Sequence, residues 1–131
     1  MIEEICTPEI TNVIRKLLTQ ATSADKVNNV YQQYLKSTSK SLYSYVVDGE
    51  IVACIGIEIK SNNIAEILHI AVCASERGKH IGSAMIQAIC NQYALKRVFA
   101  ETDQDAVGFY EKCGFKIISL GEMYPGVERF N

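Results

Sequence analysis

The stretch from Ile64 to Cys73 is apolar at nearly every position, and it constrains the fold more than any other part of the chain. Its sequence, IAEILHIAVC, interrupts the apolar residues only with Glu66 and His69. A strand that is apolar on both faces lies in the middle of a sheet whose two faces are covered. A polar turn with two glycines and then a helical pattern follow directly. We therefore expect a central strand that ends at a helix N-terminus.

The hydrophobic period upstream of this strand predicts two helices and a hairpin. Apolar residues at helical spacing indicate one amphipathic helix that starts at Thr7-Pro8-Glu9 and a second that follows Ser23. The period then changes to 2, and Asp48-Gly49 is a typical two-residue hairpin turn between Leu42–Val47 and Glu50–Lys60. Two helices and a hairpin therefore precede the central strand.

The same periods predict four elements downstream. These are a helix from Ile81 to Tyr93, a strand from Arg97 to Glu101, a short helix that Asp103 caps and that runs to Lys112, and a strand from Phe115 to Leu120. Gly114 is well placed as the C-cap of the short helix. Pro125-Gly126 predicts that the last extended piece bends or lies at a sheet edge. The order predicts an α/β fold of the α+β type, with a mixed sheet and helices on both faces.

Composition and length exclude several classes of protein. A chain of 131 residues suits a single domain over 1–131, and 48% hydrophobic against 21% charged residues excludes intrinsic disorder. The net charge of −2 argues against a nucleic-acid partner. We expect no membrane partner, since there is no signal peptide and no apolar run of roughly 20 residues.

The cysteines indicate a reducing compartment. They are five in number, widely spaced and without a Cys-x-x-Cys pair: Cys6, Cys54, Cys73, Cys90 and Cys113. We expect them to be free and to pack as small core residues. The pattern predicts a cytoplasmic protein without a metal site.

The turn after the central strand has a chemical interpretation and a structural one. It reads Arg77-Gly78-Lys79-His80-Ile81-Gly82. Unpaired amides at a helix start, approached through glycines and flanked by basic residues, can bind a phosphate or pyrophosphate. The same glycines also suit an ordinary strand-to-helix turn, and the turn by itself does not separate the two interpretations.

A second motif lies further along the chain. The segment DQDAVGFYEKCGF, from Asp103 to Phe115, is similar to the signature Asn-x-x-Ala-x-x-hydrophobic-Tyr-Glu-Lys-x-Gly-Phe. Helical spacing places Phe109, Tyr110 and Cys113 on one face with Ala106, so Tyr110 has an alternative role as a core residue.

Together, the strand, the turn and this segment resemble the GNAT superfamily of N-acetyltransferases. The matching stretch runs from about Ile64 to Phe115, and the upstream helices and hairpin extend the resemblance to nearly the whole chain. It implies a GNAT-like, largely antiparallel mixed sheet, and an acetyl-CoA-dependent N-acetyltransferase whose acceptor, a small-molecule or peptide primary amine, attacks directly. The alternative is a non-catalytic GNAT-like module that binds CoA or acyl-CoA as a sensor or partner. A homodimer is an open alternative to a monomer.

The resemblance also implies which residues hold acetyl-CoA and which act on it. The cofactor-binding set is Ile70, Ala71, Val72, Arg77, Gly78, Lys79, His80, Ile81, Gly82, Ser83, Asp103 and Tyr110. Tyr110 is implied to protonate the departing thiolate. His80 replaces a usual glycine and Asp103 a usual asparagine, and both departures bear on cofactor affinity. We expect Gly82→Val to impair cofactor binding more than folding.

The base that accepts the proton of the amine has three candidates. Glu66 is the first, because it is an isolated carboxylate on the central strand; its structural alternative is a hydrogen-bonded or edge glutamate. His69 is the second, with a hydrogen-bonded structural histidine as its alternative, and ordered water is the third. A strand amide near Val72 is expected to hold the oxyanion. Cys73 and Cys113 are expected to pack in the core, because direct attack needs no protein nucleophile.

Overall fold

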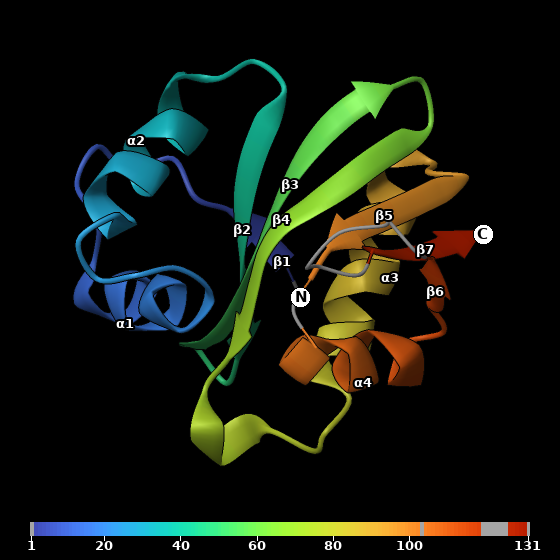
Figure 1. The fold of residues 1–131 in the computed structure, drawn as a ribbon. Coiled ribbons are helices and arrows are strands. Elements are labelled where there is room, and N and C mark those ends of the chain that lie inside the picture. Colours follow the sequence, from blue (N-terminus) through green and yellow to red (C-terminus); the bar gives the residue numbers. More distant parts are fainter. Residues whose placement is uncertain (1, 103, 119–125, 131) are drawn as a thin grey trace.

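The computed structural model describes residues 2–102, 104–118 and 126–130. Figure 1 labels its elements in chain order. They are β1 (Ile2–Glu4), α1 (Asn12–Ala21), α2 (Val27–Lys36), β2 (Lys40–Val47), β3 (Glu50–Ser61), β4 (Ile64–Val72), a short 3-10 helix (Ala74–Glu76), α3 (Ile81–Tyr93), β5 (Arg97–Glu101), α4 (Gln104–Lys112), β6 (Lys116–Ile118) and β7 (Gly126–Phe130).

The strands of the described residues form one sheet in the order β1-β2-β3-β4-β5-β7-β6. Every neighbouring pair is antiparallel except β4 and β5, which are parallel. This confirms the expected mixed, largely antiparallel sheet. Asp48 and Gly49 both have positive φ, at +52° and +81°, which is the backbone that a tight hairpin turn between β2 and β3 needs.

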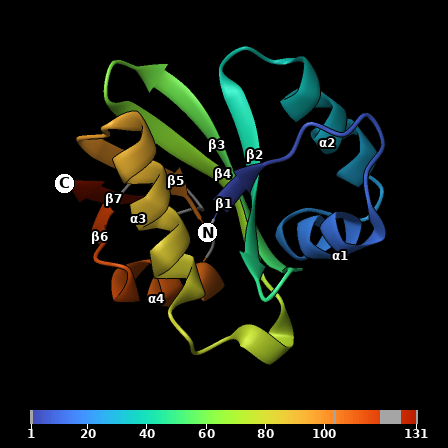
Figure 2. The same cartoon turned by 180° about the vertical axis from the view of Figure 1, so that it is seen from behind.

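Helices cover both faces of the sheet, as the apolar strand predicts (Figures 1 and 2). On one face, α1 and α2 bury Ile14, Leu18 and Tyr31 against the sheet. On the other face, α3 and α4 bury a larger cluster that includes Met85 and Tyr110. Burial of this apolar surface on two sides of one sheet is the main stabilising contribution to the fold.

One boundary prediction is wrong, and one of the two alternatives predicted for the last strand is excluded. Helix α1 begins at Asn12, after Thr11, whose hydroxyl accepts the amide of Ile14. Thr7, the predicted cap, instead contacts the hydroxyl of Tyr31 with its side chain at 2.9 Å, and its carbonyl accepts from that hydroxyl. The final strand β7 does not lie at an edge, because it pairs with β5 on one side and with β6 on the other.

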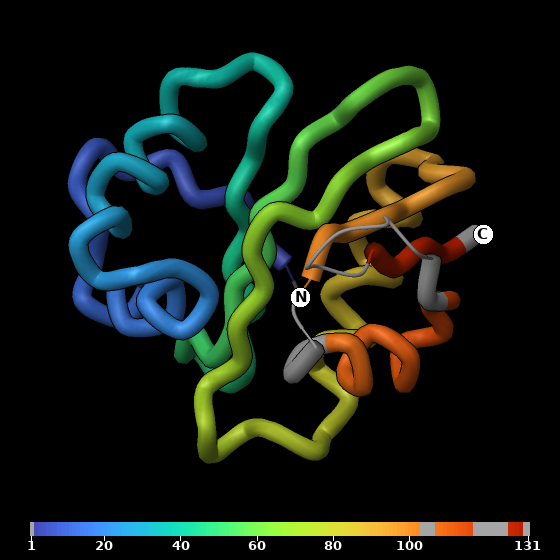
Figure 3. Tube along the Cα trace, viewed as in Figure 1, coloured from blue at the N-terminus to red at the C-terminus, as the bar shows by residue number. Residues whose placement is uncertain are grey.

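The parallel pairing between β4 and β5 is short. It joins Ile64–Glu66 to Arg97–Phe99 and then stops, and the two strands diverge beyond this point (Figure 1). The other edge of β5 is occupied by β7 along its whole length. The second half of β4 is therefore left with an edge that no strand of the described residues covers. Figure 3 follows the chain from this end of β4 through the turn into α3.

A β-bulge interrupts β4 within this same half. Gly56 of β3 is paired with His69, whereas its neighbour Ile57 is paired with Ile67, so Leu68 is the extra residue of β4. Ile67 packs in the cluster under α3 and α4. His69 contacts Tyr34, which belongs to the opposite cluster. The bulge therefore turns His69 to the face that carries α1 and α2.

Candidate active site

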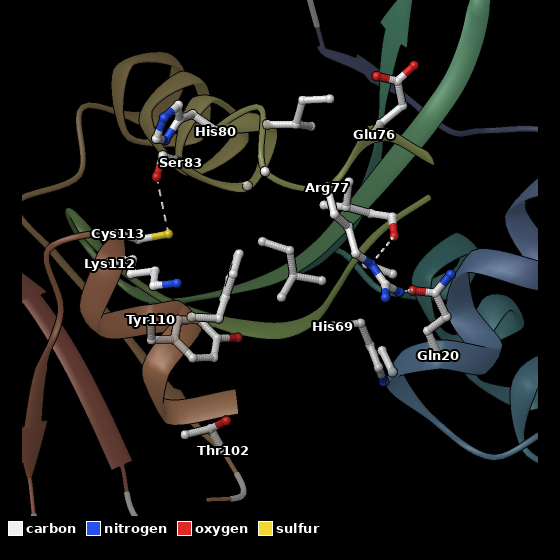
Figure 4. A pocket seen from close by; sticks show the side chains of 18 of the residues that line it. Gln20, His69, Glu76, Arg77, His80, Ser83, Thr102, Tyr110, Lys112 and Cys113 are labelled. Atoms are coloured by element: carbon white, nitrogen blue, oxygen red, sulfur yellow. Dashed lines mark hydrogen bonds between the residues drawn. The ribbon is translucent and has the colours of Figure 1, made fainter. Parts of the chain in front are cut away.

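A cleft of about 1190 Å³ opens where β4 and β5 diverge (Figure 4). Ligand sites for drug-sized molecules usually have roughly 300–1,000 Å³, so this cleft has room for a long ligand. Its walls come from the end of α1, the second half of β4, the turn, the start of α3, the end of β5 and one face of α4. They are formed by Gln20, Ala21, Leu68, His69, Ile70, Ala71, Val72, Glu76, Arg77, Gly78, His80, Ile81, Gly82, Ser83, Glu101, Thr102, Phe109, Tyr110, Lys112 and Cys113.

The edge of β4 offers backbone hydrogen-bonding groups to the cleft. The amide of Cys73 donates to Val52 of β3 at 2.8 Å. Because the direction of the peptide groups alternates along a strand, Val72 and Ile70 direct theirs away from β3, toward the open edge. Ala71 directs its own groups to β3. Of the three predicted strand residues, Ile70 and Val72 therefore present their backbone to the cleft, and Ala71 lines it without doing so.

The predicted residues Arg77 to Gly82 form the loop after the 3-10 helix and the first residues of α3. His80 is the N-cap and has a left-handed backbone, with φ 62° and ψ 24°. Histidine tolerates this region better than most residues, which explains how it replaces a glycine here. The first intrahelical bond runs from Ala84 to the carbonyl of His80. The amides of Ile81, Gly82 and Ser83 precede that bond and have no partner within the helix, as at every helix start.

The basic side chains of the turn, Arg77 and Lys79, bind other groups of the protein. Arg77 donates to the carbonyl of Val72 at 3.2 Å and to Gln20 of α1 at 2.8 Å, which ties the turn to the first helix. Lys79 forms an ion pair with Glu76 at 2.7 Å. Lys112 of α4 lines the cleft and forms no ion pair within the described part of the chain. Lys112 is not among the residues that the sequence predicted for the cofactor site, although the Tyr-Glu-Lys motif contains it.

Tyr110 combines a core position with a place in the cleft. Its side chain is 5% exposed, and its ring meets Phe109 and Phe115 edge to face at 5.3 and 5.2 Å between centroids. Its hydroxyl end points into the cleft (Figure 4). The two roles that the sequence left open therefore coexist: packing fixes the ring, and the ring presents the hydroxyl.

Gly82 has a packing role that the sequence did not reveal. It is buried, and a Cβ built at this position would lie 2.4 Å from the ring of Phe109. The glycine therefore lets α3 and α4 approach closely. We now expect Gly82→Val to damage folding as well as cofactor binding, contrary to the expectation from the turn alone.

Glu66 is held in an ion pair and does not line the cleft. Its carboxylate is 3.3 Å from Lys60, which also pairs with Glu58 at 2.9 Å, and Glu66 is not among the residues that line the cleft. A catalytic role of Glu66 stays a prediction. Its ion pair with Lys60 favours the alternative, a paired structural carboxylate.

His69, the second candidate, does line the cleft. Its Nδ1 lies 2.5 Å from the hydroxyl of Tyr34, a residue of α2. Burial, and after it the charge of Lys40, lowers the pKa of His69 below its ordinary value. Burial also raises the pKa of Tyr34, so its hydroxyl stays protonated throughout the physiological range. The pair is thus a neutral imidazole and a neutral phenol.

This pKa shift predicts that the protein loses stability in mild acid. In the unfolded chain His69 titrates near 6.5, whereas in the folded protein its pKa is lower. Between these two values the unfolded state binds more protons, so the free energy of unfolding falls as the pH drops below about 6.5. Urea unfolding at a series of pH values measures the slope, and His69→Gln is expected to reduce it. An equal slope in both proteins would contradict this prediction.

Two further predictions concern cysteines and metals. All five cysteines are free, but Cys6 is exposed and Cys73 is only partly buried, which corrects the expectation that each packs in the core. Cys113 is buried and accepts from the hydroxyl of Ser83 at 3.2 Å. Among the described residues, no three His, Cys, Asp or Glu side chains are grouped as metal ligands.

Asp103, which was expected in the cofactor site, lies outside the described residues.

None of the helices in the described ranges is both long and apolar enough to cross a membrane.

Comparison with known proteins gives a family match and several similar structures. The model of the acetyltransferase (GNAT) family matches residues 8–115. A GNAT family acetyltransferase from Elizabethkingia anophelis with acetyl-CoA bound is 19% identical and has a TM-score of 0.75, over 100% of this chain and 97% of that one. An aminoglycoside 6'-acetyltransferase type Ii is 19% identical, with a TM-score of 0.79 over 99% and 96%. A Bacillus subtilis acetyltransferase in complex with CoA is 16% identical, with a TM-score of 0.74 over 99% and 97%. At these identities the structural likeness shows the fold.

Proposed function

The chain belongs to the acetyltransferase (GNAT) family and is an acetyl-CoA-dependent acetyltransferase, and we propose that its acceptor is a primary amine that attacks the thioester directly. The family match confirms the resemblance seen in the sequence. One observation carries the proposal: the open edge of β4 and the first turn of α3 border the same cleft, opposite the hydroxyl of Tyr110. The strand edge suits the amides of the pantetheine arm, the helix start suits the pyrophosphate, and the Tyr110 hydroxyl suits the departing thiolate.

The residues of the cleft fit the parts of acetyl-CoA. Ile70 offers strand-type hydrogen bonds from the open edge of β4 to the pantetheine amides. The amides of Ile81, Gly82 and Ser83, with the positive end of the α3 dipole, suit the pyrophosphate. Lys112 adds a cation at the side of α4. Related structures contain acetyl-CoA or CoA by their own descriptions, which supports the same ligand for this cleft.

Acetyl-CoA, when bound, supplies an acetyl thioester, and the protein has three tasks around it. The amide of Val72, directed to the open edge, donates to the developing oxyanion. The hydroxyl of Tyr110 donates to the departing thiolate. The amine must also lose a proton, and for a lysine-like amine with pKa about 10.4 this costs about 4.6 kcal/mol at neutral pH. We assign that proton to water in the open cleft, because Glu66 lies outside it.

A turnover assay tests the alternative, a non-catalytic binding module. The protein is incubated with acetyl-CoA and a panel of amines that includes a polyamine, an amino sugar, an aminoglycoside, free amino acids and a peptide N-terminus, and thiol release is followed. We expect turnover with at least one class. CoA binding without thiol release above the hydrolysis background for any class would favour the non-catalytic module.

Acetyl-CoA is expected to stabilise the protein before any acceptor is known. A ligand that binds only the folded state at 100 times its Kd adds about 2.7 kcal/mol to the free energy of unfolding. Thermal unfolding with and without millimolar acetyl-CoA measures this as an increase in Tm. Desulfo-CoA is a control that keeps the pyrophosphate and pantetheine groups and should stabilise similarly. An unchanged Tm with both ligands would remove the cleft as the cofactor site.

A further inference from the structure

The contact between Tyr34 and His69 determines which nitrogen of the imidazole carries the proton. The hydroxyl oxygen of Tyr34 and Nδ1 of His69 are 2.5 Å apart, so one of them donates to the other. Tyr34 is 6% exposed, and a buried hydroxyl proton needs an acceptor. Within the described residues, Nδ1 of His69 is the acceptor that this hydroxyl reaches. Tyr34 is therefore the donor and Nδ1 the acceptor.

A neutral imidazole that accepts at Nδ1 carries its proton on Nε2. We propose that Tyr34 is a positioning residue that holds His69 with its proton on Nε2, so that the imidazole offers the cleft a hydrogen-bond donor for a ligand oxygen instead of a base. The tautomer stands on the geometry alone. The use of the donor during acetyl transfer rests on the proposed function.

The local structure is arranged to keep this pair together. The β-bulge at Leu68 turns His69 toward α2, as described above. Gly56, the partner of His69 in β3, leaves the space that the end of the Tyr34 ring occupies: a Cβ at this position would lie 1.9 Å from the hydroxyl oxygen. The two rings meet edge to face at 5.6 Å. The bulge at Leu68, the glycine at position 56 and the hydroxyl of Tyr34 thus together fix the position of the His69 ring.

The position of His69 in the cleft indicates what its donor meets. In Figure 4, His69 lies with Gln20 and Arg77 on one side, whereas Tyr110, Ser83 and Lys112 lie on the other. The second side carries the groups that fit the cofactor. We assign the donor on His69 to an oxygen of the amine substrate or of the acyl group. The charged or titratable groups around the Tyr34–His69 pair are Lys40, Cys54, Glu58, Glu66 and Arg77.

Nitrogen NMR of the imidazoles tests the tautomer directly. The chain has two histidines, so a ¹⁵N-labelled sample shows two rings, and His80→Asn assigns them because asparagine tolerates the left-handed backbone of position 80. At neutral pH we expect the proton of His69 on Nε2. In Tyr34→Phe we expect both tautomers and a higher pKa of His69, because the bond that favours the neutral ring is lost.

Two results would overturn the proposal. One is a wild-type His69 with its proton on Nδ1, which needs no variant to be measured. The other is a Tyr34→Phe protein in which the tautomer and the pKa are unchanged. Neither result depends on acetyl transfer, so both remain informative if no acceptor is found.

A pair of substitutions then separates a donor from a base. His69→Gln keeps an N–H donor near the position of Nε2, whereas His69→Leu removes it. With the best amine of the panel, we expect His69→Leu to lower kcat/KM by roughly tenfold or more, and His69→Gln to restore most of it. Equal losses in the two variants would show that His69 acts as a base or only as packing. Absence of turnover in the wild-type protein would instead count against the proposed function.

Discussion

Tyr110→Phe is expected to lower kcat by roughly 10²-fold, with little change in stability or in CoA affinity. The substitution keeps the ring and therefore its contacts with Phe109 and Phe115, and it removes only the hydroxyl that points into the cleft. Loss of a positioned proton donor typically costs 10²-fold or more when the leaving group develops charge in the transition state. Steady-state kinetics under conditions where chemistry limits the rate, with thermal unfolding of both proteins, measure the effect.

Tyr93→Phe is the matched control for this experiment. Tyr93 packs against the same cluster, and its hydroxyl contacts Tyr43, but it does not line the cleft. Removal of its hydroxyl should leave kcat within about twofold of the wild-type value. A wild-type kcat in Tyr110→Phe would return Tyr110 to the core alone.

Gly56→Ala is expected to lower the free energy of unfolding by about 3 kcal/mol and Tm by roughly 10 °C. Gly56 is buried in β3, and the added Cβ would lie 1.9 Å from the hydroxyl oxygen and 2.3 Å from Cζ of Tyr34. The Tyr34 ring is buried between α2 and the sheet, so it cannot move aside without breaking its own contacts. Urea unfolding and calorimetry give both quantities.

Two comparisons identify the cause of that loss. Gly108→Ala, in the exposed part of α4, adds a Cβ that meets nothing within 4 Å, and it should stabilise the helix by about 0.5–1 kcal/mol. In a Tyr34→Ala background, Gly56→Ala should cost less than about 1 kcal/mol, because the atoms that it would meet are gone. An equal cost of Gly56→Ala in both backgrounds would mean that strand backbone, not Tyr34, opposes the alanine.

The local patterns of the chain were sufficient for most of the elements and for the family. The β2–β3 hairpin follows from Asp48-Gly49, whose positive φ values few other pairs adopt as easily. The central position of β4 follows from its apolar residues on both faces. The Phe-Tyr-Glu-Lys motif lies on α4 where it was expected. Each of these signals depends on residues close together in sequence.

The features that the local patterns did not predict have a common physical reason. Thr7 and Thr11 are equally good caps by type, and the choice of Thr11 depends on the contact between Thr7 and Tyr31, 24 residues away. Strand β1 has three residues, too few for a period, and it exists because it pairs with Tyr43–Tyr45 of β2. The place of β7 between β5 and β6 likewise depends on long-range pairing.

The sequence by itself determined the turn, the strand that leads to it, the tyrosine of α4 and hence the class of chemistry. Only the tertiary structure decided which of these groups face the cleft. A strict period of two would put His69 on the same face as Ile67, and the bulge at Leu68 places it with Tyr34 instead. Lys60 determines the surroundings of Glu66, and Phe109 determines the role of Gly82. Strand register, bulges and side-chain partners depend on residues distant in the chain, and local patterns carry no information about them.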